Sequence, residues 1–149
     1  MILIPEIKPN QSVELLKALH ILTRDGKINQ DSRRKLKQVY HLYHFIEPLL
    51  IEVMAENENP TLVDHGAGKS YLGFILYDLF MKLQQSGQII GIETRVELVQ
   101  KSRELAKSLG FKRMSFEHLS VEESIQSPAL PEQIDIVTAL HACDTATDD

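Results

Sequence analysis

From Thr61 onward the sequence alternates short apolar runs with amphipathic segments, and this alternation constrains the fold more than any other feature. The apolar runs are residues 61–65 (TLVDH), 88–93 (QIIGIE), 113–118 and 134–140. Between the first three runs, residues 69–86 and 96–109 have helical periodicity, and Gly110 follows the second of these as a suitable helix C-cap. Strands that alternate with helices form a parallel sheet covered by helices, so we predict an α/β fold.

The region before Thr61 has the periodicity of helices. Asn10 or Ser12 can cap a first helix that continues to Leu22, and Asp25 with Gly26 breaks the pattern after it.

A second helix can begin at a cap formed by Asp31 or Ser32, and its apolar stripe extends from Leu36 to Met54. Pro48 should kink or interrupt this helix because proline lacks the backbone N–H. We therefore expect an N-terminal helical region at residues 1–58 and a sheet domain at residues 59–149.

Composition indicates one globular domain, and its net charge indicates no extended basic surface. The chain has 149 residues, of which 43% are hydrophobic and 25% charged, with a net charge of -5. This charge excludes a basic footprint over the whole surface, although a local run of bases could engage an RNA backbone, at Arg33, Arg34, Lys35 and Lys37.

The single cysteine, Cys143, excludes an internal disulfide and suits a reducing compartment. The N-terminus lacks the pattern of a signal peptide, and no segment approaches the ~20 apolar residues of a membrane span. We therefore expect a cytoplasmic protein that does not enter a membrane.

The stretch VDHGAGKS, residues 63–70, places a glycine turn directly after the first apolar run, where parallel sheets bind ligands. A phosphate-binding P-loop would need a glycine at the position of Val63. The dinucleotide fingerprint would need a third glycine at the position of Tyr71. Neither pattern fits the turn.

A third pattern fits, since this turn resembles the acidic residue and Gly-x-Gly of class I S-adenosylmethionine-dependent methyltransferases. S-adenosylmethionine carries a sulfonium, an ammonium and a carboxylate, so an acidic side chain beside a glycine backbone suits it. A triphosphate would require a cationic nest in place of the acidic residue. The resemblance implies a Rossmann-like sheet, S-adenosylmethionine as cofactor, and a cofactor-binding turn formed by Asp64, His65, Gly66, Ala67 and Gly68.

The ends of the next two apolar runs also match this family. An acidic residue that closes the second strand accepts hydrogen bonds from the ribose hydroxyls, and it lies about 20 or more residues past the turn. The resemblance assigns this role to Glu93, with Thr94 and Arg95 beside it. Residues after the third strand flank the adenine ring in the family, and here they are His118, Leu119 and Ser120.

The segment ALHACDTATDD, residues 139–149, resembles a methyltransferase subgroup with a Leu-His-Ala-Cys-Asp-Thr-Ala-Thr-Asp run after the fourth strand. The resemblance implies that Leu140 and His141 line the cofactor site and that His141 or Asp144 is the candidate catalytic base. Members of this subgroup are thought to modify RNA or protein, so the methyl acceptor stays unidentified.

Other interpretations of these residues remain open. Asp64 and Glu93 could each cap the helix that follows. A nucleophilic Cys143 or a metal site that includes it is disfavoured, because partners for either role normally converge from separate elements. A non-catalytic interaction module and a degenerate P-loop nucleotide-binding protein are the alternative functions.

The class I sheet has further strands after the fourth, whereas this sequence stops at Asp149. We therefore expect a sheet truncated after the fourth strand. Its exposed edge would favour a homodimer.

Overall fold

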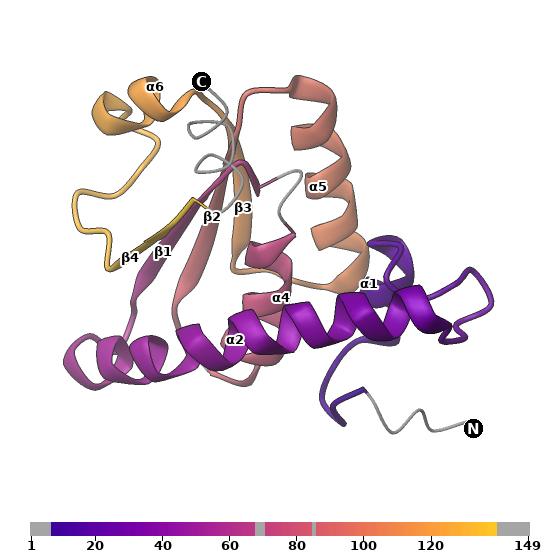
Figure 1. Cartoon of the computed structure of the whole chain (residues 1–149). Coiled ribbons are helices and arrows are strands. Elements are labelled where there is room, and N and C mark those ends of the chain that lie inside the picture. The colour runs from indigo at the N-terminus through magenta and orange to yellow at the C-terminus, as the bar shows by residue number, and fades with distance from the viewer. Residues whose placement is uncertain (1–6, 68–70, 85, 140–149) are drawn as a thin grey trace, which may run out of the picture.

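The computed structural model describes residues 7–67, 71–84 and 86–139. Within these ranges four parallel strands form one sheet in the order β3-β2-β1-β4, which confirms the predicted α/β class (Figure 1). The strands are β1 Thr61–His65, β2 Gln88–Glu93, β3 Met114–His118 and β4 Ile136–Thr138. The first two match the predicted ranges, and the last two are shorter than predicted.

The helices cover the two faces of the sheet unequally. They are α1 Val13–Ala18, α2 Gln30–Glu56, α4 Leu72–Leu79, the 3-10 turn η1 Met81–Leu83, α5 Val96–Leu109 and α6 Val121–Gln126. Side chains of α1, α2, α4 and α5 pack in one core with Leu62, Ile89 and Phe116. Successive strand residues point to opposite faces, so Val63, Ile90 and Ile92 form a smaller cluster on the other face, on the side of α6 (Figure 1).

Helix α1 begins as predicted but ends earlier than predicted. Ser12 is its N-cap and accepts a hydrogen bond from the N–H of Leu15. Residue His20 adopts φ 60°, and the N–H groups of His20 and Ile21 donate to the carbonyls of Lys17 and Leu16. This is the hydrogen-bond pattern of a Schellman motif, with histidine where glycine is usual.

Helix α2 starts and continues differently from the prediction. Its N-cap is Asn29, whose side chain accepts from the N–H of Ser32 at 2.8 Å, and neither Asp31 nor Ser32 has this role. Pro48 lies inside the helix and does not interrupt it. Proline in a helix interior costs ~3 kcal/mol, and burial of Tyr43 and Leu50 on either side offsets that cost.

Helix α4 is shorter than the predicted crossover helix of residues 69–86. Tyr71 is its N-cap and has a left-handed backbone, with φ 59°. The helix ends at Leu79, and η1 follows it. The apolar spacing of residues 72–83 spans both elements, so periodicity did not reveal the break between them.

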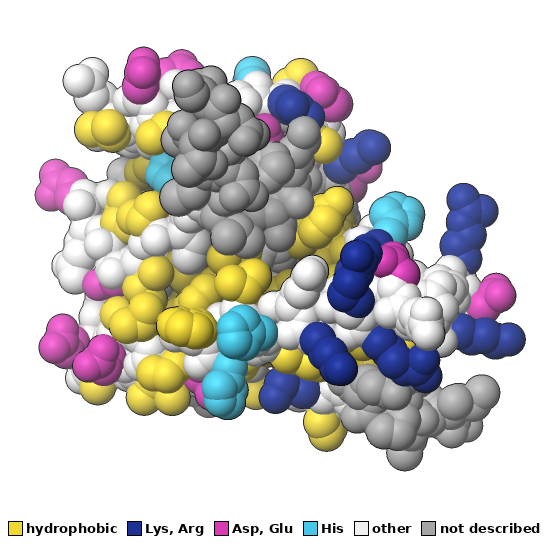
Figure 2. Space-filling model, viewed as in Figure 1, with side chains coloured by type: hydrophobic (Ala, Val, Ile, Leu, Met, Phe, Trp, Pro, Cys, Tyr) yellow, Lys and Arg dark blue, Asp and Glu magenta, His cyan; other side chains and the backbone are white. Residues whose placement is uncertain are grey.

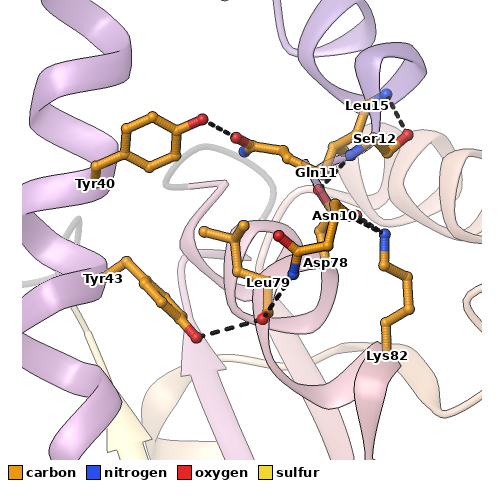
Figure 3. Close-up of polar contacts among 9 residues, drawn as sticks. All are labelled: Asn10, Gln11, Ser12, Leu15, Tyr40, Tyr43, Asp78, Leu79 and Lys82. Carbon is orange, nitrogen blue, oxygen red and sulfur yellow. Dashed lines mark hydrogen bonds and ion pairs between the residues drawn. The ribbon is translucent and has the colours of Figure 1, made fainter. Parts of the chain in front are cut away.

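A polar network fixes the N-terminal segment to α4 (Figure 3). The carboxylate of Asp78 is fully buried and accepts from the N–H of Ser12 at 2.9 Å and from Nζ of Lys82 at 2.6 Å. The same Nζ donates to the carbonyl of Asn10 at 2.7 Å. Tyr43 of α2 donates to the carbonyl of Leu79 at 3.3 Å. Because a buried carboxylate needs paired donors, this network joins α1, α2 and α4 at the C-terminal end of α4.

Candidate functional site at the carboxyl edge of the sheet

The sheet brings the ends of its strands to one edge. The register pairs Asp64 with Gly91 of β2 and with Thr138 of β4, and it pairs Glu93 with His118 of β3. All pairs are parallel, so these carboxyl ends face the same side of the molecule, where open α/β sheets bind ligands. Strands β2 and β3 lie on one side of β1, and β4 lies on the other side. The strand order therefore reverses at β1, which is the switch point.

Asp64 joins three elements at this edge. Its side chain is fully buried, Oδ2 accepts from the N–H of Gly73 in α4 at 3.1 Å, and Oδ1 accepts from Oγ1 of Thr138 in β4 at 2.6 Å. Asp64 therefore satisfies a backbone donor in the first turn of α4, as the alternative interpretation anticipated. Contact of Asp64 with a ligand stays a prediction.

The turn that follows β1 lies close over β2. Gly66 has φ 73°, a backbone that suits glycine, and its N–H donates to the carbonyl of Ile92 at 2.8 Å. A Cβ on Gly91 would lie 2.7 Å from Cβ of the buried Ala67 and 2.5 Å from the ring of Phe116. The backbone of β2 can approach the turn only because residue 91 is glycine. Gly68 lies outside the described residues.

Glu93 closes β2 and is 6% exposed. Its Oε2 accepts from the N–H of Arg95 at 3.0 Å, and Oγ1 of Thr94 lies 3.5 Å from the same oxygen. Arg95 is the N-cap of α5, so Glu93 orders the entrance to that helix. A carboxylate held in this way at the edge of the sheet can also accept hydrogen bonds from a ligand.

His118 and Leu119 follow β3 and lie beside the end of β2. The ring Nε2 of His118 lies 2.8 Å from the carbonyl of Thr94. A carbonyl only accepts, so this nitrogen carries the proton and donates. The N–H of Leu119 donates to the carbonyl of Glu93 at 3.1 Å, and its side chain packs on the smaller core cluster. These predicted residues are therefore brought together with Glu93 and Thr94.

His65 lies on the opposite face of the sheet from Asp64, because neighbouring strand residues alternate. It lines a cavity of about 430 Å³ together with Val63, Ile134 and Val137. The residue is 9% exposed, and its Nδ1 has no hydrogen-bond partner within the described part of the chain. Burial lowers the pKa of His65 from its ordinary value of 6.5.

This pKa direction predicts a pH-dependent stability. The folded protein keeps the ring neutral, whereas the unfolded chain binds a proton below about pH 6.5. With respect to His65, the unfolding free energy is therefore at its full value above pH 6.5, and it decreases as the pH falls from there towards the pKa of His65 in the folded protein. Urea unfolding measures the unfolding free energy at pH 7.5 and at pH 5.5. We expect this free energy to decrease from the higher to the lower pH in the wild type, and to decrease less in His65→Asn. Equal decreases would show that another group is responsible.

Three predicted site residues after β4, namely Leu140, His141 and Asp144, lie outside the described residues. Two residues that sequence reasoning missed are Gly91 and Thr138, which contact the turn and Asp64. Glycine inside a strand often marks a close backbone approach, so QIIGIE carried a signal for the first. Nothing in the sequence pairs Thr138 with Asp64.

Comparison with known proteins places the chain in a family. A family model described as a methyltransferase domain matches residues 34–149, so the chain belongs to this methyltransferase-domain family. Ribosomal RNA small subunit methyltransferase G of Streptococcus gordonii is 29% identical over 115 residues. Those residues are 76% of this chain and 46% of that protein, so the chain spans less than half the length of this curated relative.

Solved structures share the fold at low sequence identity. A Klebsiella pneumoniae protein assigned as an O-methyltransferase superposes with a TM-score of 0.56 at 16% identity, over 88% of this chain and 54% of that one. The SAH-bound methyltransferase PaMTH1 of Podospora anserina has a TM-score of 0.52 at 13% identity, over 85% and 48% of the two chains. The predicted Rossmann-like methyltransferase sheet is thus confirmed.

Proposed function

We propose that this chain is the cofactor-binding part of an S-adenosylmethionine-dependent methyltransferase. The observation that carries the proposal is the close approach of the turn at Gly66 and Ala67 to Gly91, beside the buried carboxylate of Glu93. A Cβ at residue 91 would fill the space that the turn occupies. Membership of a methyltransferase-domain family supports the same assignment.

Each predicted residue has a role in this proposal. The carboxylate of Glu93 accepts hydrogen bonds from the ribose hydroxyls, and Thr94 and Arg95 border it. His118 and Leu119 flank the adenine. The methionine end of the cofactor lies along the turn after β1, from Asp64 through His65, Gly66, Ala67 and Gly68, with Leu140 and His141 completing the pocket.

Bound S-adenosylmethionine supplies a methyl group already activated by the sulfonium. The chain has to hold the acceptor nucleophile in line with that methyl, and such positioning can lower a barrier by roughly 7–11 kcal/mol. We assign His141 or Asp144 the removal of a proton from the acceptor, where the acceptor carries one.

The acceptor is RNA or protein in this proposal, and the chain acts in the cytoplasm. Within the described residues, no helix is long and apolar enough to cross a membrane. The edge of β4, where Val137 is 56% exposed, is the surface that we propose for a homodimer.

Calorimetric titration with S-adenosylhomocysteine tests the proposed function. We expect the wild type to bind and Glu93→Ala to bind about 10- to 100-fold more weakly, since hydrogen bonds to a charged group contribute about 1.5–3 kcal/mol. Glu97→Ala is the matched control, because Glu97 is an exposed acid in the first turn of α5.

Retained affinity in Glu93→Ala would remove Glu93 from the site. Absence of binding by a folded wild type would favour a non-catalytic interaction module. Binding of magnesium ATP in its place would favour a degenerate P-loop protein.

A further inference from the structure

The positive charge of the chain is concentrated around the start of α2. Residues 17–37 contain seven Lys and Arg against two Asp, a net charge of +5 in a chain whose total is -5. Figure 2 shows Lys and Arg side chains gathered over this half of α2 and the loop before it. We call this the basic surface, and it comprises Arg24, Lys27, Arg33, Arg34, Lys35 and Lys37.

Of the two acids in this segment, Asp31 forms ion pairs that do not neutralise the basic surface. Asp31 pairs with Arg34 at 2.5 Å and with Lys35 at 3.1 Å, and the side chains of this group are between 38% and 69% exposed. Exposed pairs of this kind contribute little to stability, because water and salt screen their charges. A polyanion can therefore replace Asp31 as their partner at little cost.

The basic surface is connected to the candidate site. Lys35 donates from Nζ to the carbonyl of His20 at 3.2 Å, which fixes the start of α2 against the end of α1. His20 lines a cavity of about 190 Å³ with Tyr71, Phe74 and Lys101. Tyr71 begins α4 after the turn at β1, so this cavity lies between the basic surface and the carboxyl edge of the sheet.

Tyr71 presents an aromatic ring at this position. The residue is 39% exposed. Its backbone has φ 59°, a conformation that is unfavourable for a bulky residue. Among the described residues Tyr71 lies outside the buried core, whereas the neighbouring Leu72 and Phe74 belong to it. An exposed ring beside cations is the combination that binds single-stranded nucleic acids, whose bases stack while their phosphates pair with Lys and Arg.

We propose that the methyl acceptor is a single-stranded nucleic acid, held by its phosphates on the basic surface and at Lys101, with one base stacked on Tyr71. This inference rests on the proposed function, because it names the acceptor of the same site. An acidic peptide would satisfy the cations but would leave Tyr71 without a planar partner.

The test is fluorescence anisotropy of the full chain with a labelled uridine 15-mer, and with the DNA of matching sequence, across a salt series. Removal of each cation that pairs with a phosphate should reduce the slope of log affinity against log salt by about 0.7. Arg34→Gln with Lys101→Gln should therefore reduce the slope by about 1.4 and weaken binding at low salt. The matched control is Lys107→Gln with Lys112→Gln, since both lysines line a cavity with Ala106 and Phe111, separate from the one at Tyr71.

Tyr71→Leu should weaken binding about 5- to 100-fold with the slope unchanged, and Tyr71→Phe should restore affinity. Equal slopes in the two double variants, or wild-type affinity in Tyr71→Leu, would overturn the proposal. Displacement of the RNA by poly-glutamate, together with unchanged binding by Tyr71→Leu, would also overturn the proposal. That result would indicate an acidic protein acceptor.

Titration with S-adenosylhomocysteine on the same samples separates this inference from the proposed function. Cofactor binding without nucleic-acid binding would overturn only the acceptor assignment. Nucleic-acid binding without cofactor binding would overturn the proposed function and the acceptor role with it.

Discussion

Replacing Asp64 with alanine is expected to lower the free energy of unfolding by about 3 kcal/mol or more. The carboxylate is fully buried, and it accepts from the N–H of Gly73 and from the hydroxyl of Thr138. Without it the buried N–H of Gly73 is left unpaired and the half-buried hydroxyl of Thr138 loses its acceptor. An unsatisfied buried donor costs about 1–3 kcal/mol, and the cavity left by the side chain adds to that cost. Urea unfolding of the two proteins, with equal denaturant slopes, measures this loss.

Thr138→Val is the matched comparison for that variant. It removes only the donor to Oδ1 and leaves the contact with Gly73, so we expect a loss of about 1 kcal/mol. If both variants lost the same amount, Asp64 would not be holding α4 against β1. The account of how the turn is fixed at this edge would then be wrong.

Gly91→Ala is expected to have the second large effect, because it changes both stability and ligand binding. The added methyl would lie 2.5 Å from the ring of Phe116 and 2.7 Å from Cβ of Ala67. Overpacking of a core typically costs about 1–3 kcal/mol. The displaced turn should also weaken binding of S-adenosylhomocysteine, and calorimetry measures that affinity.

Gly110→Ala is the control for Gly91→Ala. Gly110 is the C-cap of α5 with φ 73°, and a Cβ there would meet nothing within 4 Å. This variant should lose about 1 kcal/mol of stability through backbone strain and keep its affinity for the ligand. Unchanged affinity in Gly91→Ala would contradict the role of the close approach.

The regular elements could be predicted where local signals agree. Helix α5 matches its predicted range because an apolar periodicity ends at Gly110, and the first two strands are short apolar runs with polar boundaries. Helix α2 was predicted less well at Pro48, because tertiary packing of its buried stripe outweighs the local cost of proline. The left-handed Tyr71 at the start of α4 gave no local signal, since tyrosine rarely adopts that backbone.

The candidate site could be predicted only in part, for a related reason. Glu93 and the turn after β1 were predicted because their residue types and spacing follow a family pattern. The hydrogen bond of Thr138 to Asp64 joins residues 74 positions apart, and sheet order alone determines it. The proximity of His20 to Tyr71 and Lys101 could not be predicted either, because it depends on the packing of α1 on α5.

The central claim is that Glu93 holds the sugar of the cofactor above the turn at Gly66. A crystal structure of this chain grown with S-adenosylhomocysteine measures it most directly. We predict that a ribose hydroxyl lies about 2.5–3.0 Å from a carboxylate oxygen of Glu93, with the homocysteine end along the turn. A nucleoside bound away from Glu93 would contradict the claim.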